Sequence, residues 1–290
     1  MNRGRQRTVA KEITLEGTGV HSGEAATLTF HPAGPGAGVR FRRTDLPGTP
    51  EIPATLDHVV ATELGTSLGR DGVRVLTVEH VLAALYSQGV DNVTVDLTGP
   101  EIPIRDGSFQ DFVAALRDAG VSEQDADVRV LAPETPIQVR GDDGESYVVT
   151  PAEGLRISAT IDFQHPLIGR QFGSFEVRAE AFSTELAPAR TFGFRADADP
   201  LHKRGLALGA SLENTVVLDD NGIMNEDLRF PDEFLRHKVG DIVGDLALLG
   251  ARLDAHVVAE RPSHAGNVAL ARALAEHTRR SGRVPIIDVA

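Results

Sequence analysis

Residues 231–249 read PDEFLRHKVGDIVGDLALL and give the clearest helix signal in the chain. Proline is favoured in the first turn of a helix, so Pro231 marks the predicted start. Asp232 and Glu233 beside it suit the positive end of the helix dipole, and Gly250 follows the last apolar turn. The spacing therefore predicts one continuous helix over the whole stretch.

Short alternating segments on either side of this helix predict β-strands, and three further segments have helical spacing. The predicted strands are residues 27–30, 39–42, 73–76, 92–97, 137–140, 146–150 and 155–163; the other predicted helices are 77–86, 108–117 and 267–279. Thr77 is the predicted N-cap of the first of these helices. Because strands and helices alternate irregularly, we expect an α+β fold of layered sheets and helices rather than a doubly wound parallel sheet.

The chain is long enough for two domains, since 290 residues exceed what one compact core usually holds. Residues 120–136 form an acidic stretch interrupted by Gly and Pro, which is typical of a domain boundary. We therefore expect residues 1–125 to form an N-terminal α+β domain and residues 126–290 to form a C-terminal α+β domain.

Composition and charge exclude several classes of protein. Lys and Arg total 29 against 42 Asp and Glu, so the formal net charge is −13. Such an acidic chain lacks the basic stripe that duplex binding requires, and a chain with 2 Tyr and no Trp offers few platforms on which single-stranded bases can stack. We therefore expect no nucleic-acid partner.

Cysteine is absent, so disulfides and thiolate ligands are excluded and any metal must be held by His, Asp or Glu. The basic start of the chain, residues 1–17, is not followed by the apolar segment of a signal peptide. A run of 18 apolar residues does not occur either. These features predict a cytoplasmic protein without a transmembrane segment.

The helix predicted over residues 231–249 carries His237, Asp241 and Asp245 at intervals of four residues. Steps of four keep all three side chains on one face of a helix. His237 and Asp241 therefore have the spacing at which one helix gives two ligands to one metal. The same spacing is common in exposed helical ion pairs, so taken alone it does not decide between the two interpretations.

Glu79 and His80 lie where a predicted strand runs into a helix. Taken alone, this pair is more typical of a carboxylate near a helix start beside an ordinary histidine than of a metal site. Together with His237 and Asp241, His80 makes a set of two imidazoles and one carboxylate with an open fourth position, the pattern of a catalytic zinc. Glu79, next to a ligand, could then act as general base for water on the metal.

His264 lies in a polar loop that leads into the last predicted helix. A helix N-terminus lowers the pKa of a histidine, so a protonated His264 needs a carboxylate nearby. Asp245 can supply it if the loop folds over the metal; otherwise His264 is an ordinary polar loop residue. Lys238, one of three lysines in the chain, directly follows His237 and suits contact with a phosphate, although chance also explains its place.

Eight motifs run in order along the chain: GVHSG (19–23), TVEH (77–80), PEIPIRDGS (100–108), ARTFGF (189–194), NEDLRF (225–230), FLRHK (234–238), GDL (244–246) and SHA (263–265). In these motifs and their order the chain resembles the zinc-dependent UDP-3-O-acyl-N-acetylglucosamine deacetylases, which commit a cell to lipid A synthesis. The resemblance implies a hydrolase that converts UDP-3-O-acyl-N-acetylglucosamine to UDP-3-O-acyl-glucosamine and acetate. It also implies two layered α+β domains with the active site between them.

The resemblance assigns roles to individual residues. The implied metal ligands are His80, His237 and Asp241; the implied catalytic residues are Glu79 as general base, His264 as general acid, Asp245 as support of His264, and Thr191 beside the oxyanion. The implied substrate-binding residues are Lys238 at the nucleotide, Phe192 at the sugar, and Ser211 and Val217 in the segment 206–217, which would line an apolar passage for the acyl chain. The family also implies a monomer, and Fe²⁺ could replace Zn²⁺ without changing the hydrolysis.

Three positions depart from the family pattern. Gly65 stands where many members carry a Cys near the metal, Glu63 replaces a commonly apolar residue, and Ala210 stands where a Gly is frequent. The reaction requires none of the usual residues at these positions. The departures bear instead on metal affinity, on the shape of the active-site wall and on the preferred acyl chain.

Two other functions could use the same ligands. Two His and one carboxylate also form the iron site of non-haem oxygenases, but that chemistry needs no adjacent Glu base. A metal-stabilised binding protein for nucleotide sugars or acyl groups would not need Glu79, His264 and Thr191 together. An acid–base pair around a metal site therefore favours the hydrolase.

Overall fold

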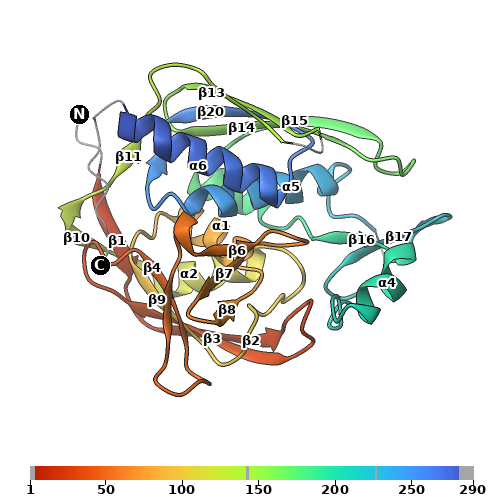
Figure 1. Cartoon of the computed structure of the whole chain (residues 1–290), viewed down its shortest axis with the longest axis horizontal. Helices are drawn as coiled ribbons and strands as arrows, with labels where there is room; N and C mark the ends of the chain where they lie inside the picture. The colour runs from red at the N-terminus through yellow and green to blue at the C-terminus, as the bar shows by residue number, and fades with distance from the viewer. Residues whose placement is uncertain (1–3, 142–143, 226, 281–290) are drawn as a thin grey trace.

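The computed structural model describes residues 4–141, 144–225 and 227–280, and two five-stranded sheets form its outer layers (Figure 1). The first sheet comprises, in spatial order, β2 (Ile13–Thr18), β3 (Ala25–Pro32), β9 (Val93–Leu97), β4 (Val39–Arg43) and β5 (Glu51–Pro53). Neighbouring strands are antiparallel except β4 and β9. Alternate residues such as Leu28, Phe30 and Val95 are buried, as expected for strands with one face on the core.

The second sheet is built from the later part of the chain. Its strands, in spatial order, are β12 (Ile137–Arg140), β13 (Ser146–Pro151), β20 (Ala255–Glu260), β14 (Leu155–Asp162) and β15 (Arg170–Glu176). β20 pairs in parallel with β14 and antiparallel with β13, so the last of the described strands lies in the centre of the sheet. Val149, Ile157 and Val257 turn their buried side chains to the core.

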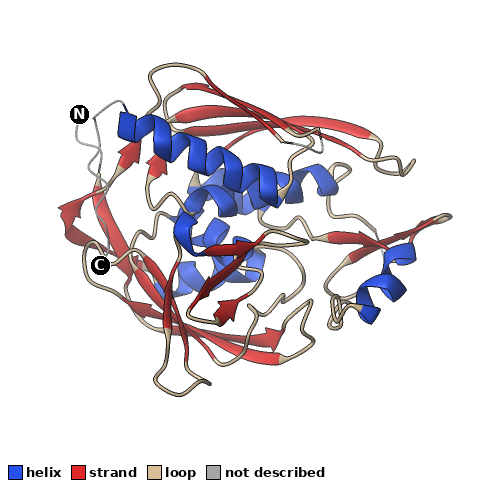
Figure 2. Cartoon of the chain, viewed as in Figure 1, coloured by secondary structure: helices blue, strands red, loops and turns tan. Residues whose placement is uncertain are grey.

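Four helices fill the space between the two sheets (Figure 2). They are α1 (Glu79–Gln88), α2 (Gln110–Ala119), α5 (Glu233–Ala247) and α6 (His264–Arg280). α2 packs against α1 and β2 of the first sheet, whereas α5 and α6 pack against strands of the second sheet. α1 also packs directly on α5, so these two helices join the two halves of the molecule.

The remaining elements are short. The strands are β1 (Arg5–Val9) paired with β10 (Val121–Asp127), β11 (Val130–Leu131) paired with β19 (Arg252–Leu253), β6 (Val59–Ala61), β7 (Ser67–Arg70) and β8 (Val73–Val75) in one small sheet, and β16 (Phe192–Phe194), β17 (Val216–Asp219) and β18 (Gly222–Ile223) in another. The helical turns are η1 (Leu56–His58), α3 (Ala179–Ala181), η2 (Phe182–Leu186), η3 (Arg195–Asp197) and α4 (Ala198–Lys203).

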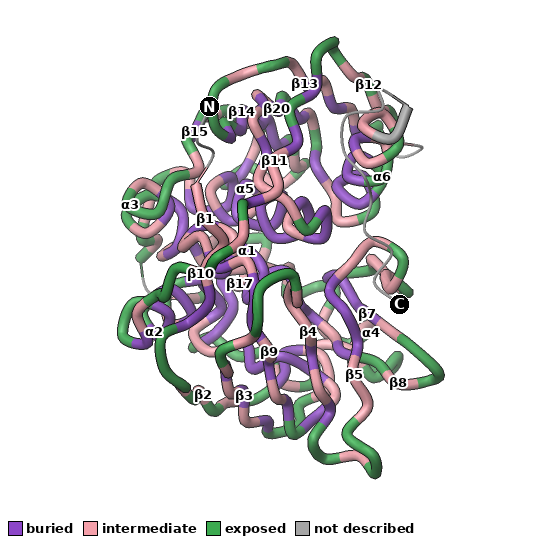
Figure 3. Tube along the Cα trace, turned by 90° about the vertical axis from the view of Figure 1, so that its left-hand side faces the viewer, coloured by how far each residue is buried: buried purple, intermediate pink, exposed green. Residues whose placement is uncertain are grey.

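Most residues of α1 and α5 are buried (Figure 3). Gly244 of α5 faces the backbone of α1 so closely that a Cβ added there would overlap the carbonyl oxygen of Glu79. A Cβ added at Gly240 would likewise overlap the ring of Phe109. Glycine at position 244 therefore allows the close approach that places the start of α1 beside α5, and glycine at position 240 leaves room for the ring of Phe109.

Gly244→Ala is expected to destabilise the protein by about 1–3 kcal/mol, because the added methyl group must displace backbone rather than a movable side chain. The free energy of unfolding from urea denaturation is the measurement. Gly34→Ala is the matched control, since a Cβ at Gly34 meets nothing within 4 Å, and should stay within about 1 kcal/mol of the wild type. Equal stabilities for the two variants would contradict the close packing of α1 on α5.

The α+β fold predicted from the sequence is confirmed, but the four predicted helix starts were wrong. α2 begins at Gln110 instead of Ser108, and α6 begins at His264, which was predicted to lie in the loop before that helix. α5 begins at Glu233 with Asp232 at its N-cap position, so Pro231 precedes the helix instead of lying in its first turn. α1 begins at Glu79 with Val78 at its N-cap position. Thr77 does not cap that helix because its hydroxyl donates a hydrogen bond to Glu101 Oε1 (2.8 Å), and its φ of 59° lies in the left-handed region.

The stretch 120–136 contains β10 and β11, so the acidic segment is partly strand. A domain division between residues 125 and 126 stays a proposal. Within the described parts of the chain, helices long and apolar enough to cross a membrane are absent. Residues 1–3, at the start of the basic N-terminal segment, lie outside the described residues.

Candidate active site

Three potential metal ligands meet where α1 packs on α5. His80 lies in the first turn of α1, and His237 and Asp241 lie one turn apart on α5. One ligand atom from each of the three buried residues lies within 4.8 Å of the others. The Nδ1 of His237 donates to the carbonyl oxygen of Ala189 (3.0 Å), which leaves its Nε2 3.4 Å from Asp241 Oδ1. The fold thus brings together the ligand set predicted from the sequence.

The chemistry of these side chains fits a cation. Among the described residues, His80 Nδ1 and Asp241 Oδ1 are buried and have no hydrogen-bond partner, which is costly unless something else satisfies them. Burial lowers the pKa of His80 to about 3 and also lowers the pKa of His237, so both imidazoles are neutral. Burial opposes ionisation of Asp241, but the neighbouring groups, of which the Lys238 ammonium contributes most, together outweigh burial and hold the pKa of Asp241 below its usual range. Neutral imidazoles and a carboxylate are the forms that bind metals.

Glu79 precedes His80 and is also buried. Its Oε2 accepts a hydrogen bond from the backbone N–H of Thr66 (2.9 Å). Loss of solvent raises the pKa of Glu79 to about 7, against the opposing charge of His264. A divalent cation on the neighbouring ligands would favour the ionised form and lower this pKa. Glu79 therefore has the proton affinity of a base that works near neutral pH.

His264 is the first residue of α6, and its Nδ1 donates to Asp245 Oδ2 (2.9 Å). Burial alone would lower the pKa of His264, but the Asp245 carboxylate raises it to about 9. The Nε2 of His264 lies 3.8 Å from Asp241 Oδ2, so the ring faces the ligand cluster. The sequence predicts contact between His264 and Asp245 only if the segment around His264 folds over the metal site. The structure contains this contact.

Lys238 reaches the same cluster. Its Nζ lies 2.9 Å from Asp241 Oδ2. Burial would lower the pKa of Lys238, but the surrounding carboxylates, Asp241 foremost, together outweigh burial and raise this pKa, so the side chain stays an ammonium. The cluster therefore combines three potential metal ligands with a fixed positive charge.

Thr191 and Phe192 lie on the segment that supports His237. Thr191 follows Ala189 by two residues, and its N–H donates to the carbonyl oxygen of Gly107 (2.8 Å). The ring of Phe192 packs edge-on against Phe163 and Phe234, with ring centroids 5.4 and 5.0 Å apart. The segment that carries both residues is thereby fixed to α5 and to the PEIPIRDGS motif.

Ser211 and Val217 lie further along the chain. Ser211 is in the turn before β17, where its N–H donates to Asn214 Oδ1 (2.9 Å). Val217 is in β17, paired with Gly193 of β16. Their hydrogen bonds and strand pairing, as described, do not include the metal ligands, so their contact with an acyl chain stays a prediction.

The three departures from the family pattern lie on two segments, with Glu63 and Gly65 before β7 and Ala210 before β17. A Cβ at Gly65 would lie 2.9 Å from Glu79 Oε1, so glycine leaves room for that carboxylate. Glu63 forms an ion pair with Arg204 (2.7 Å) just after α4, and thereby joins the loop before β7 to the segment before β17. Ala210 lies in a turn of that segment, and its backbone N–H donates to the carbonyl oxygen of Ala207 (3.2 Å).

Sequence reasoning missed the buried carboxylates that hold the loops in place. Glu101 accepts hydrogen bonds from the N–H groups of His21 and Ser22 and from the hydroxyl of Thr77. Glu233, interpreted only as a dipole partner, forms a buried ion pair with Arg190 (2.8 Å). The occurrence of Glu101 inside a recognised motif was the one available signal, because its partners are far apart in sequence.

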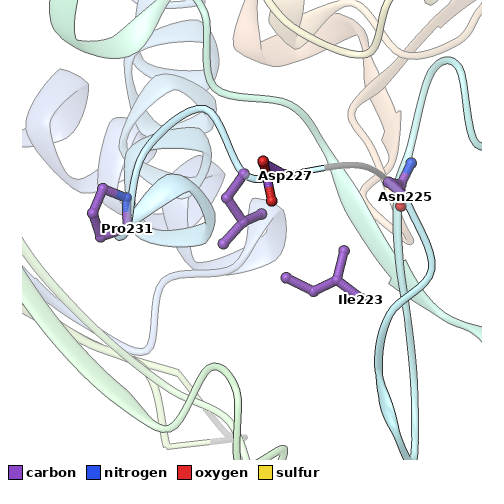
Figure 4. A pocket seen from close by; sticks show the side chains of 5 residues that line it. Ile223, Asn225, Asp227 and Pro231 are labelled. Atoms are coloured by element: carbon purple, nitrogen blue, oxygen red, sulfur yellow. The ribbon is translucent and has the colours of Figure 1, made fainter.

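A hollow lies away from the predicted metal ligands. Its volume is about 540 Å³, and it is lined by Ile223, Asn225, Asp227, Leu228 and Pro231 in the loop before α5 (Figure 4). The lining includes none of the predicted metal ligands. Asn225, Asp227 and Leu228 belong to the NEDLRF motif, of which Glu226 lies outside the described residues.

Known proteins resemble this chain over most of its length. A family model described as UDP-3-O-acyl N-acetylglycosamine deacetylase (LpxC) matches residues 6–276. Curated relatives named UDP-3-O-acyl-N-acetylglucosamine deacetylase include one from Myxococcus xanthus, 48% identical over 92% of this chain and 85% of its own length. Another, from Anaeromyxobacter dehalogenans, is 49% identical over 92% of this chain and 86% of its own length. The chain belongs to the UDP-3-O-acyl N-acetylglycosamine deacetylase family.

Proposed function

We propose that this protein hydrolyses the N-acetyl group of UDP-3-O-acyl-N-acetylglucosamine to give UDP-3-O-acyl-glucosamine and acetate, the committed step of lipid A biosynthesis. The observation that carries the proposal is the placement of Glu79 and His264 beside the three potential ligands. A base and a charged acid around a metal site are what amide hydrolysis requires. The family and the names of the curated relatives support the substrate.

The proposed metal is Zn²⁺, held by His80, His237 and Asp241. Two imidazoles and one carboxylate with an open position are typical of catalytic zinc, and Fe²⁺ can use the same donors. Bound there, the ion would lower the pKa of a water molecule to about 7 and polarise the amide carbonyl.

Glu79 is the proposed general base. Its carboxylate accepts the proton of the water that attacks the acetyl carbon, and its buried position keeps bulk solvent from competing for that proton. The Thr66 N–H bonded to Oε2 leaves Oε1 available for this step. Thr191 is proposed to donate a hydrogen bond to the carbonyl oxygen as it gains negative charge.

His264 is the proposed general acid. The amine that leaves the acetyl group needs a proton, which His264 gives from Nε2 while Nδ1 stays bonded to Asp245. Lys238 is proposed to contact the diphosphate of the substrate as a point charge. Phe192 is proposed to contact the sugar, and the segment with Ser211 and Val217 is proposed to line the acyl passage.

All proposed site residues come from one chain, which is compatible with a monomer. We place the reaction in the cytoplasm because the substrate is a nucleotide sugar. The two alternative functions are not favoured. An iron oxygenase needs no base beside its ligands, and a binding protein needs neither that base nor a charged acid.

Product analysis tests the proposed function. Purified, Zn²⁺-loaded protein is incubated with UDP-3-O-acyl-N-acetylglucosamine of several acyl lengths, and acetate and the free amine are measured by mass spectrometry. Equal amounts of the two products are expected. Substrate binding without either product would instead support the binding protein.

Asp245→Asn is expected to move the alkaline limb of the kcat–pH profile to lower pH. The Asp245 carboxylate raises the pKa of His264, so its neutralisation lowers that pKa. A general acid is protonated only below its pKa. As the pH rises, the variant therefore loses activity at a lower pH than the wild type does. Profiles of kcat against pH for both proteins, with metal content measured throughout, provide the test. Coincident alkaline limbs would show that Asp245 does not support the acid.

A further inference from the structure

Thr66, in the loop between β6 and β7, contacts the proposed base and the support of the proposed acid. This residue is fully buried. Its backbone N–H donates to Glu79 Oε2 (2.9 Å), and its hydroxyl donates to Asp245 Oδ1 in a short hydrogen bond. The hydroxyl oxygen also lies 3.5 Å from His264 Nδ1. One residue thus touches groups that come from opposite halves of the chain.

The backbone of Thr66 is fixed to the start of α1. Its carbonyl oxygen accepts the N–H of Val78 (3.0 Å), and its own N–H is bonded to Glu79. β7 begins at the next residue, Ser67. Both polar backbone groups are therefore satisfied by α1, and the side chain is held on the side of α5.

The side-chain carboxylate of Asp245 accepts three hydrogen bonds from described residues. Thr66 supplies the one that does not come from α6. Oδ2 accepts from His264 Nδ1 (2.9 Å) and from Asn267 Nδ2 (2.8 Å), and both donors lie in the first turns of α6. Oδ1 accepts from the Thr66 hydroxyl. Without that hydroxyl, Oδ1 would lose a donor in a buried site and the carboxylate plane would lose one of its three fixed points.

We propose that Thr66 is a positioning residue that fixes the base Glu79 relative to the Asp245–His264 pair. Glu79 and His264 can then act on the same substrate amide. The inference rests on the proposed hydrolytic function. Thr66 itself does not touch the reacting atoms in this account. Its backbone holds the base, and its hydroxyl holds the support of the acid.

The test compares Thr66→Val, which removes only the hydroxyl, with Thr66→Ser, which keeps it. Thr66→Val is expected to lower kcat by about 10–100-fold with KM and bound zinc unchanged, as for other groups that orient an active-site partner. Thr66→Ser is expected to restore most of kcat. Thr8→Val is the matched control, because Thr8 is also buried and hydrogen-bonded through its hydroxyl, to the N–H of Ala33 (2.9 Å).

A second readout does not depend on activity. The low-field proton signal of His264 Nδ1–H is expected in the wild type and in Thr66→Ser, and is expected to broaden by solvent exchange in Thr66→Val. A wild-type kcat or an unchanged signal in Thr66→Val would overturn the inference, as would equal losses in Thr66→Val and Thr66→Ser.

Two further outcomes are also decisive. If Thr66→Val does not fold, Thr66→Ala replaces it; failure of both to fold would make Thr66 a structural residue and overturn the inference. Wild-type protein that releases no acetate overturns the proposed function, and the His264 signal then decides separately whether Thr66 holds the Asp245–His264 pair.

Discussion

Glu79→Gln is expected to lower kcat by about 10²–10⁴-fold while the protein still binds its metal and substrate. Glutamine keeps the size of the side chain and can still accept the Thr66 N–H through its amide oxygen. It cannot take a proton from water. Because Glu79 is not one of the three ligands within 4.8 Å of one another, the site itself should persist.

The measurement combines steady-state acetate release with metal analysis of the same preparation. Glu51→Gln is the control, since Glu51 pairs with Arg40 on the first sheet, outside the ligand cluster, and its loss should leave kcat unchanged. A Glu79→Gln variant with full metal and near wild-type kcat would exclude Glu79 as the base.

His237→Gln is expected to lower metal affinity by more than about 100-fold, and acetate release with it. Loss of an outer partner of a metal ligand already costs about 10–100-fold, so loss of a ligand should cost more. Glutamine fills most of the space of the imidazole, which limits the change in packing. Addition of excess Zn²⁺ should restore part of the activity, because His80 and Asp241 remain.

Metal content after dialysis against a graded series of zinc buffers gives the affinity. His256→Gln is the control, because His256 bonds to Ser158 on the second sheet and lies outside the cluster. Equal zinc affinities for the two variants would remove His237 from the ligand set.

Local patterns predicted the central helix and the residues that share its face. The four-residue spacing of His237, Asp241 and Asp245 depends only on helix geometry, and α5 preserves it. His80 was assigned to the same site although it lies on α1, because the chemistry of a catalytic metal needed a further imidazole. The pairing of α1 with α5 then brings these residues together.

Tertiary contacts determine the roles of several residues that local sequence patterns do not predict. Thr77 has the residue type and place of an N-cap, but the buried carboxylate of Glu101 takes its hydroxyl instead. The backbone carbonyl group of Ala189 orients His237, and the residue type at position 189 gives no indication of this role. Thr66 lies 179 residues from Asp245, and local periodicity does not report contacts at that separation.

Metal-dependent acetate release is the most direct test of the central claim. Purified protein is assayed on UDP-3-O-acyl-N-acetylglucosamine as isolated, after removal of metal with a chelator, and after stepwise addition of Zn²⁺. Release is expected to stop on chelation and to return in proportion to zinc, up to one ion per chain. Release that persists in metal-free protein, or no release from folded and zinc-loaded protein at any acyl length, would contradict it.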